Sequence, residues 1–281
     1  MVGQFSLFAV LAVTLVAEVA NALPPQKIMG GEAAAPGEFP YQVSLRINGR
    51  HACGGTIISN RHIVTSAQCV IDLPSIYDLV VVTGSLSSTN GGQCHMPQQI
   101  VYHPEFNRQS TGPNDIAIIA LATVINFNAY QNMLYLPKTR TPSGVRATVT
   151  GWGWVSPNVP SNVDYLRKLT VRTITAEECQ RYATTVLYTH QMCAYAGPGR
   201  GSCMVRSRKI RAIVHKIQNP FGKTASLSSL YFKADSGGPL ARDGLLIGVV
   251  SYGNPCGAGI PDVFTSVYHY CDWIRYVVAN S

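Results

Sequence analysis

The sequence predicts an all-β fold that ends in one helix. Residues 28–281 make up 254 residues, a length that suits a single β-rich unit with a sizeable core. Segments 147–150 and 245–250 are rich in strand-forming side chains, and clusters of Gly and Pro separate such segments. Near the C-terminus, apolar residues recur at helical spacing and predict one amphipathic helix. These residues are Tyr270, Trp273, Ile274 and Val277.

The N-terminal segment has the composition of a secretory signal peptide. Residues 5–17 are uncharged and mostly apolar, and this run is too short to span a bilayer. Ala20-Asn21-Ala22 follows as a small-residue cleavage pattern, so we expect a signal peptide over 1–22, a propeptide over 23–27 and secretion. Residues 1–4 lack the usual Lys or Arg, and the alternative is a buried N-terminal helix. We expect no membrane-spanning segment elsewhere.

Six short motifs follow one another over about 230 residues. Each is weak by itself, but six in this order are specific. The motifs occupy 27–31 (KIMGG), 51–56 (HACGGT), 114–119 (NDIAII), 150–153 (TGWG), 234–239 (ADSGGP) and 250–253 (VSYG). The chain from residue 28 onwards therefore resembles the chymotrypsin/trypsin family of serine proteases, of the secreted, insect digestive type. The resemblance implies two perpendicular antiparallel β-barrels of six strands each, a C-terminal helix and an active site between the barrels.

The resemblance assigns three catalytic positions. Ser236 matches the nucleophile, and Asp115 matches the aspartate that orients the catalytic histidine. The histidine of the family directly precedes a cysteine, but here Gln68 directly precedes Cys69. The residue that should take the proton of the serine is therefore replaced.

Gln68 is not expected to act as a general base. A carboxamide forms hydrogen bonds, but it does not take up a proton near neutral pH. His51 and His62 are the nearest alternative bases in the sequence. A sequence error or an allelic change at position 68 is a further alternative, because His and Gln codons differ by one base. As written, the chain is predicted to be catalytically defective.

An insertion interrupts the nucleophile motif. If 205–233 were removed, Met204 would join Ala234 and the chain would read as a good family motif. The resemblance places the oxyanion hole at the backbone N–H groups of Ala234 and Ser236, although the family usually has Gly at the first of these positions. A 29-residue insertion directly before Ala234 is expected to displace its N–H group.

The insertion is strongly basic. It holds seven Lys and Arg residues and no Asp or Glu, which accounts for +7 of the formal net charge of +8. A basic stretch favours nucleic acid, heparin or an acidic membrane as partner, but this one lacks a supporting motif, so we expect no nucleic-acid partner. We interpret 205–233 as a retained 87-nucleotide intron or a gene-model error, because its first two residues and its last residue fit splice-site codons. The alternative is a genuine surface loop.

The resemblance also assigns a primary specificity pocket. Gly201 takes the base position, where trypsin-like enzymes have Asp, so a strict preference for Lys or Arg is not expected. Asp262 falls at a wall position that is often Gly, where a carboxylate would accept a basic side chain from another direction. The alternative is a loop Asp that faces solvent. We expect a broad or chymotrypsin/elastase-like pocket that tolerates basic residues, with Met204, Ser251 and Gly253 as its remaining members.

Activation is expected to follow the pattern of the family. A trypsin-like protease would cut after Lys27, and the new α-amino group of Ile28 would fold inwards and pair with Asp235. These residues are all present, so the sequence predicts an intact zymogen switch even though the base is missing.

Eight cysteines in a secreted chain suggest disulfides. The resemblance pairs Cys53–Cys69, Cys179–Cys193 and Cys203–Cys256. Cys94 and Cys271 are left over, and we favour free thiols over a bond between them.

Three interpretations of function follow. The first is a secreted protease homologue without useful catalysis, which binds proteins or peptides in its cleft. The second is an active chymotrypsin/elastase-like digestive endopeptidase, if Gln68 and the insertion 205–233 are artefacts. The third is a splice product that does not fold or accumulate. All three descend from a secreted endopeptidase that hydrolyses peptide bonds through an acyl-enzyme. No motif indicates a metal or another cofactor, and we expect a monomer.

Overall fold

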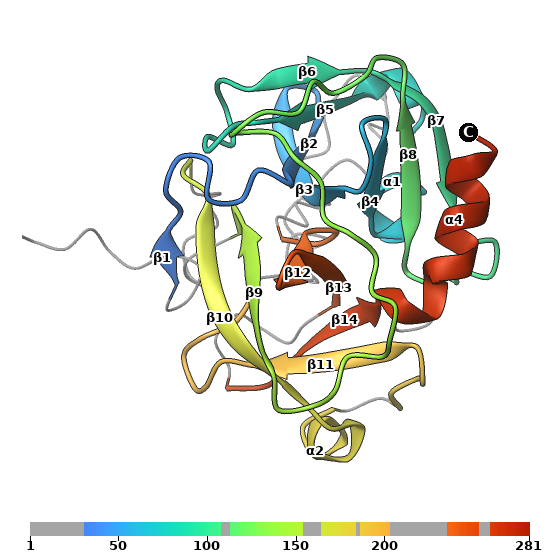
Figure 1. The fold of residues 1–281 in the computed structure, drawn as a ribbon. Coiled ribbons are helices and arrows are strands. Elements are labelled where there is room, and N and C mark those ends of the chain that lie inside the picture. The colour runs from blue at the N-terminus through green and yellow to red at the C-terminus, as the bar shows by residue number, and fades with distance from the viewer. Residues whose placement is uncertain (1–30, 108–112, 154–163, 184–185, 203–234, 253–258) are drawn as a thin grey trace, which may run out of the picture.

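The computed structural model describes residues 31–107, 113–153, 164–183, 186–202, 235–252 and 259–281 (Figure 1). Several predicted features lie outside these residues. They are the signal peptide 1–22, the propeptide 23–27, Lys27, Ile28, Cys203, Met204, the insertion 205–233, Ala234, Gly253 and Cys256.

Strands β2 to β8 form the N-terminal barrel. They are β2 (Gln42–Ile47), β3 (Arg50–Ile57), β4 (His62–Thr65), β5 (Leu79–Thr83), β6 (Gln93–His95), β7 (Pro97–Tyr102) and β8 (Ala117–Leu121), paired antiparallel in the order β6-β5-β2-β3-β4-β8-β7. The two edge strands, β6 and β7, are consecutive in the chain, and only Met96 separates them. One bent segment thus joins the two ends of the sheet and curls it into a barrel. Its interior holds Val43, Leu45, Ile57, Ile63, Ile119 and Leu121.

The C-terminal barrel is closed by the antiparallel pairing of β9 (Arg146–Gly151) with β10 (Arg167–Ile174). Its other strands are β1 (Glu32–Ala33), β11 (Gln191–Tyr195), β12 (Pro239–Arg242), β13 (Leu245–Tyr252) and β14 (Asp262–Ser266). The order β10-β11-β14-β13-β12-β9 returns to β10, which closes six strands, and β1 pairs with the start of β10. The predicted all-β fold of two antiparallel barrels is confirmed, with six strands closing the C-terminal barrel, whereas the N-terminal one is a half-barrel of seven short strands. The strands expected at 147–150 and 245–250 are also present.

The predicted C-terminal helix is α4 (Cys271–Ala279), which follows the 3-10 turn η3 (Val267–Tyr270). Figure 1 shows α4 beside β7 and β8 of the N-terminal barrel. Its apolar face buries Ile274 and Val277, which pack with Ile118 of one barrel and Leu246 of the other. The helix therefore shares one hydrophobic cluster with both barrels, and burial of this kind stabilises the structure by about 25 cal/mol per Å² of apolar surface.

Within the described residues, three further short helices lie in the connections between strands. They are α1 (Ala67–Val70), η1 (Ile76–Asp78) and α2 (Ala176–Gln180). The α2 helix begins at Thr175, whose hydroxyl accepts the N–H of Glu178 at 3.0 Å, as expected for a helix cap. The α1 helix is the important one for function, because it carries Gln68.

Two of the expected disulfides lie within the described residues. Cys53–Cys69 ties α1 to β3, and Cys179–Cys193 ties α2 to β11. Cys94 is exposed and Cys271 is buried, and neither forms a disulfide, in agreement with the preference for free thiols.

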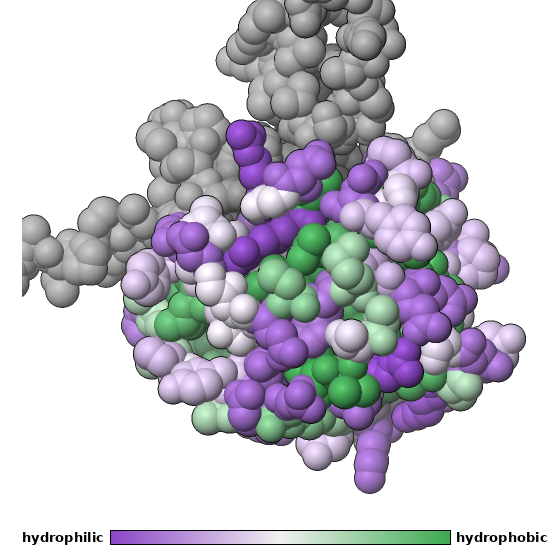
Figure 2. All heavy atoms as spheres, turned by 90° about the horizontal axis from the view of Figure 1, so that it is seen from above, coloured by the Kyte–Doolittle hydropathy of each residue, from purple (hydrophilic) through white to green (hydrophobic). Residues whose placement is uncertain are grey.

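The surface mixes polar and apolar side chains. Figure 2 shows hydrophobic side chains interspersed with hydrophilic ones on one face of the molecule. Most of the large exposed hydrophobic residues among those described are tyrosines, whose hydroxyl groups tolerate water. Within the same residues, no helix is both long enough and apolar enough to cross a bilayer.

Arg46 on β2 binds the connection between β5 and β6. Its guanidinium donates to the backbone carbonyls of Ser87 at 3.0 Å, Thr89 at 3.1 Å and Asn90 at 3.5 Å. The same connection is joined to the C-terminal barrel, since the backbone N–H of Ser88 donates to the carbonyl of Asp164 at 2.7 Å. One buried cation therefore organises a loop that bridges the two barrels.

We predict that Arg46→Met lowers the free energy of unfolding by about 2 kcal/mol, because it leaves several carbonyl groups without their charged donor. Urea unfolding measures the change. The matched control is Arg172→Met, because Arg172 is half exposed and its ion pair with Glu178 is long, at 3.4 Å. The control is expected to change stability by less than about 0.5 kcal/mol. Equal effects of the two substitutions would contradict the role assigned to Arg46.

Candidate active site

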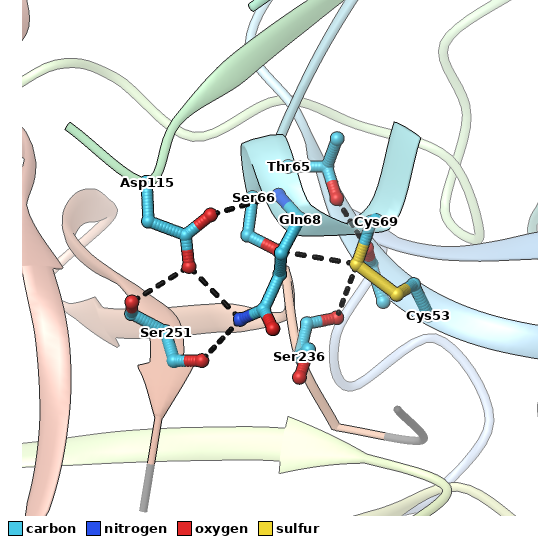
Figure 3. The surroundings of a disulfide bond; sticks show 9 residues. Cys53, Thr65, Ser66, Gln68, Cys69, Asp115, Ser236 and Ser251 are labelled. Atoms are coloured by element: carbon cyan, nitrogen blue, oxygen red, sulfur yellow. Dashed lines mark hydrogen bonds between the residues drawn. A yellow bond between two sulfur atoms is a disulfide. The ribbon is translucent and has the colours of Figure 1, made fainter. Parts of the chain in front are cut away.

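The three predicted catalytic positions meet between the barrels. Gln68 lies on α1, Asp115 directly precedes Ile116 and β8, and Ser236 lies in the turn that leads into β12. Figure 3 shows the side chain of Gln68 between Asp115 and Ser236. The structure therefore brings together residues that are up to 168 positions apart in the chain, counted from 68 to 236.

Asp115 is a buried carboxylate with three donors. It is 1% exposed. The backbone N–H of Gln68 donates to its Oδ1 at 2.9 Å, while the Gln68 amide at 2.9 Å and the Ser251 hydroxyl at 2.7 Å donate to its Oδ2. Because an ionised carboxylate only accepts hydrogen bonds, these contacts compensate for its removal from water.

The backbone around Asp115 is held as well. Its carbonyl accepts the hydroxyl of Thr265 at 2.8 Å. The preceding residue, Asn114, has φ = 61°, and its side-chain oxygen accepts the hydroxyl of Tyr270 at 2.8 Å. Asparagine tolerates this left-handed backbone better than most residues. These contacts fix the carboxylate at the junction of the two barrels.

The amide of Gln68 is oriented by its acceptors. Its Nε2 donates to Oδ2 of Asp115 and also to the backbone carbonyl of Ser251. Both partners can only accept, so the NH₂ end of the amide must face them and its two hydrogens are used there. The group that remains at Gln68 is a carbonyl oxygen, which is a hydrogen-bond acceptor but not a base.

Ser236 lies in a tightly bonded turn. Its backbone carbonyl accepts the N–H of Gly54 at 2.9 Å, and the residue is fully buried. The carbonyl of Gly54 in turn accepts the hydroxyl of Thr65 at 2.9 Å. The nucleophile position is thus attached to β3 and β4 of the other barrel, beside the Cys53–Cys69 disulfide (Figure 3).

Asp235 is buried, and its side chain faces the residues directly after the end of β9. Its Oδ1 accepts the N–H of Gly153 at 2.7 Å. A Cβ atom at Gly153 would lie 1.9 Å from Oδ2 of Asp235, so only glycine fits this position. The expected partner of Asp235 after activation, Ile28, lies outside the described residues, so their pairing stays a prediction.

Of the residues predicted to form the specificity pocket, the structure describes Gly201, Ser251 and Asp262. Asp262 begins β14 and is 5% exposed, so the alternative of a solvent-facing loop Asp is wrong. Its Oδ2 accepts the backbone N–H of Ser202 at 2.7 Å, next to Gly201. Ser251 was assigned to the pocket, but its hydroxyl faces Asp115. Sequence spacing gave no sign of this contact, because 136 positions separate the two residues.

The two alternative bases have partners elsewhere. Nδ1 of His51 lies 2.8 Å from the hydroxyl of Ser44. The two ring nitrogens of His62 lie 2.7 Å from the hydroxyl of Ser59 and 3.3 Å from that of Ser281. Burial lowers the pKa of His62. In these contacts, neither histidine takes the position between Asp115 and Ser236 that the catalytic imidazole of the family would occupy.

In the described part of the chain, no three or more His, Cys, Asp or Glu side chains lie close enough together to hold a metal ion.

The two barrels, with an aspartate and a serine meeting between them, form the chymotrypsin-like fold. The trypsin family model matches residues 28–205 and 216–274. Chymotrypsin-2 of Vespa crabro is 31% identical over 251 residues, which cover 88% of this chain and 98% of that protein. Trypsin beta of Drosophila erecta is 31% identical over 275 residues, which cover 95% and 96%. The chain therefore belongs to the trypsin family of serine proteases, whose members hydrolyse peptide bonds.

We predict that Gln68→Leu lowers the free energy of unfolding by about 2 kcal/mol, because it removes the amide donor from a buried carboxylate and a buried carbonyl. Chemical unfolding at neutral pH measures the loss. Gln99→Leu is the matched control, since Gln99 is exposed on β7. If Gln68→Leu is no more destabilising than Gln99→Leu, the amide does not hold Asp115.

Asp262 gives stability a distinct pH dependence. Burial raises the pKa of its carboxyl from 3.8 to about 7. The folded state therefore keeps a proton between about pH 4 and pH 7 that the unfolded chain releases, so stability falls as the pH rises through this window. We predict that the parent loses about 2 kcal/mol from this group between pH 5.5 and 8.5, and that Asp262→Asn abolishes that part of the pH dependence.

The measurement is urea unfolding of both proteins at several pH values. Asp243→Asn is the control, because the Asp243 side chain is 78% exposed. Parallel stability curves for the parent and Asp262→Asn would show that the carboxyl does not titrate in this range.

Proposed function

We propose that the chain as written is a secreted member of the trypsin family that binds protein or peptide segments in its cleft and hydrolyses them poorly or not at all. One observation carries the proposal. The carboxamide of Gln68 stands at the histidine position, with its nitrogen engaged by Asp115 and by the carbonyl of Ser251.

The missing step is the removal of a proton. In the mechanism of the family, the hydroxyl of Ser236 attacks the substrate carbonyl while an imidazole accepts its hydrogen and later gives it to the leaving amine. Gln68 has already donated both of its amide hydrogens, and its remaining oxygen does not take up a proton near neutral pH. Removing only the histidine of another serine protease lowers turnover by about a million-fold. Ser236 is therefore expected to remain a neutral alcohol.

The support around Asp115 does not depend on a histidine. The aspartate accepts hydrogen bonds from the hydroxyls of Ser251 and Thr265 and from the backbone N–H of Gln68. None of these donors belongs to the side chain at position 68, so all three would remain if that side chain were an imidazole. A histidine introduced at position 68 is thus expected to meet a carboxylate that is already in place to orient it.

The insertion is a second expected defect. The match to the family is interrupted between residues 205 and 216, inside the predicted insertion 205–233. The ten unmatched residues, 206–215, support a segment that is foreign to the family at that point, whereas residues 216–233 lie within the match. Its end adjoins Ala234, which is the proposed oxyanion donor beside Ser236. We therefore expect the insertion to impair catalysis even when a histidine is present.

Other assignments follow from family membership. We propose secretion after removal of 1–22, activation by a trypsin-like protease that cuts after Lys27, and a monomer that needs no cofactor. The disulfides Cys53–Cys69 and Cys179–Cys193 support an oxidising, extracellular setting.

A set of four proteins tests the proposal, each cut after Lys27. They are the parent, Gln68→His, the deletion of 205–233, and the two changes combined. We predict no measurable hydrolysis of chymotrypsin or elastase peptide substrates by the parent, a small gain with Gln68→His, and a gain of several orders of magnitude with the combined change. Initial rates with fluorogenic peptides and labelling by a fluorophosphonate are the readouts.

Gln99→His is the control, because it adds an exposed imidazole outside the site. It is expected to leave the parent inactive. Hydrolysis by the unmodified chain at the rate of an ordinary family member would show that Gln68 does not disable it. RNA reads that join the Met204 codon directly to the Ala234 codon would identify 205–233 as an intron, whereas its presence in every transcript and secreted peptide would reject the intron.

A further inference from the structure

A cavity of about 510 Å³ lies between segments of both barrels, and its volume is in the range of ligand pockets in proteins. Its lining comes mainly from the segment that follows β1, the connection between β5 and β6, and residues 164–166, which lead into β10. Figure 1 shows these three segments together at one side of the molecule. The lining shares no residue with the predicted catalytic positions or with the predicted specificity pocket.

The apolar part of the lining is fixed by contacts across the barrels. Phe39, Leu86 and Leu166 line the cavity and pack in one cluster with the buried Trp152. The ring N–H of Trp152 donates to the backbone carbonyl of Leu86 at 2.9 Å, and the backbone N–H of Leu166 donates to the same carbonyl at 2.7 Å. The cavity is therefore formed before a ligand arrives, which reduces the cost of ordering it on binding.

Three aromatic rings line the same cavity. They belong to Phe39, Tyr130 and Tyr165, of which Tyr130 is 57% exposed and Tyr165 is 62% exposed. Gly37 lies beside Tyr130, because a Cβ atom added to it would be 3.6 Å from Cδ1 of that ring. As a glycine, it contributes no side chain that would cover the ring. The faces of such rings attract cations.

Asp164 is the charged residue of the lining, which contains no Lys or Arg. Its Oδ1 accepts the hydroxyl of Ser87 at 2.6 Å and that of Thr89 at 2.8 Å. These hydrogen bonds hold the pKa of Asp164 below its usual value, so the carboxylate is ionised at neutral pH. Asp164 is exposed, and a ligand in the cavity therefore meets a negative charge beside aromatic rings.

The positive charge that acts on Asp164 belongs to a buried residue outside the lining, Arg46. Its guanidinium is already bound, since it donates to the backbone carbonyls of Ser87, Thr89 and Asn90. These carbonyls are consequently occupied as acceptors by the chain itself. Recognition of a ligand in the cavity is thus expected to depend on the side chains that line it.

We propose that this cavity binds an arginine side chain of a partner peptide or protein, with the guanidinium group at Asp164 and against the tyrosine rings. A guanidinium is planar, bonds a carboxylate and stacks on aromatic rings, so it fits all of these groups at once. A Lys ammonium would satisfy the charge but would not stack. The proposal goes beyond the cleft of the proposed function and requires no hydrolysis.

Two matched peptides test the proposal with the full chain. Both are fluorescently labelled and have five residues, with Gly on each side of a central Arg in one and of a central citrulline in the other. Citrulline has nearly the same shape as Arg but carries no charge. We expect fluorescence anisotropy at pH 7 and low salt to show about tenfold tighter binding of the Arg peptide. Equal affinities, or no binding of either peptide, would overturn the proposal.

Photo-crosslinking shows where the Arg peptide binds. This step is needed because the predicted specificity pocket also contains a carboxylate, that of Asp262. An Arg peptide with a diazirine side chain next to its Arg is irradiated with the full chain, and the cross-linked segments are identified by mass spectrometry. We expect cross-links to residues 36–42, 84–92 or 164–166. Cross-links confined to other segments would overturn the proposal.

Variants of the lining assign the binding to its side chains. Asp164→Asn and Tyr165→Leu are each expected to weaken binding of the Arg peptide by about fivefold or more, whereas Tyr165→Phe keeps the ring and is expected to bind like the parent. Asp243→Asn and Tyr276→Leu are the matched controls, because both side chains are exposed and lie outside the lining.

The exposed position of Tyr165 makes its substitution decisive even if Asp164→Asn fails to fold. Binding like that of the parent by Tyr165→Leu would overturn the stacking, and the same result with a folded Asp164→Asn would overturn the role of the carboxylate. Either result rejects the site as proposed. The proposed catalytic defect would be unaffected, because the cavity and the catalytic positions share no residue.

Discussion

The buried carboxylate of Asp115 is the constraint around which the two barrels meet. It comes from the N-terminal barrel, while Ser251 and Thr265, which bond it, belong to β13 and β14 of the C-terminal barrel. Such a charge must be satisfied whether or not the chain catalyses a reaction. An amide N–H satisfies it as an imidazole N–H would, and Gln68 donates one at 2.9 Å. At position 68, the donor that the fold requires is therefore separable from the base that the chemistry requires.

Three buried carboxyl groups near this junction differ in what compensates for their removal from water. Asp115 receives side-chain and backbone donors from both barrels. Asp235 accepts the backbone N–H of Gly153, where the absence of a side chain makes room for it. Asp262 receives the backbone N–H of Ser202, and burial raises the pKa of its carboxyl to about 7, so it is largely protonated only below that pH. The first two carboxyl groups are held by hydrogen-bond donors, and the third is a buried group whose charge changes near neutral pH.

The sequence predicted the architecture well because the motifs of the family are short and local. The strands around 147–150 and 245–250, the C-terminal helix and the meeting of Gln68, Asp115 and Ser236 all agree with the structure. The position of the Ser251 hydroxyl could not be predicted in the same way, since its contact with Asp115 joins strands far apart in the chain. The burial of Asp262 could not be predicted either. An Asp directly after Pro261 is equally compatible with a loop and with the first residue of β14. Long-range packing determines both side-chain directions.

The place of α4 after the described strands affects the order in which the fold can form during synthesis. Ile274 and Val277 pack in one cluster with Ile118 of the first barrel and Leu246 of the second, so an apolar surface on each barrel stays open until α4 has been made. A nascent chain that stops before Cys271 has made every strand and yet exposes that surface to water and to other chains. Termination before α4 is thus a route to aggregation rather than to a slightly shortened folded protein.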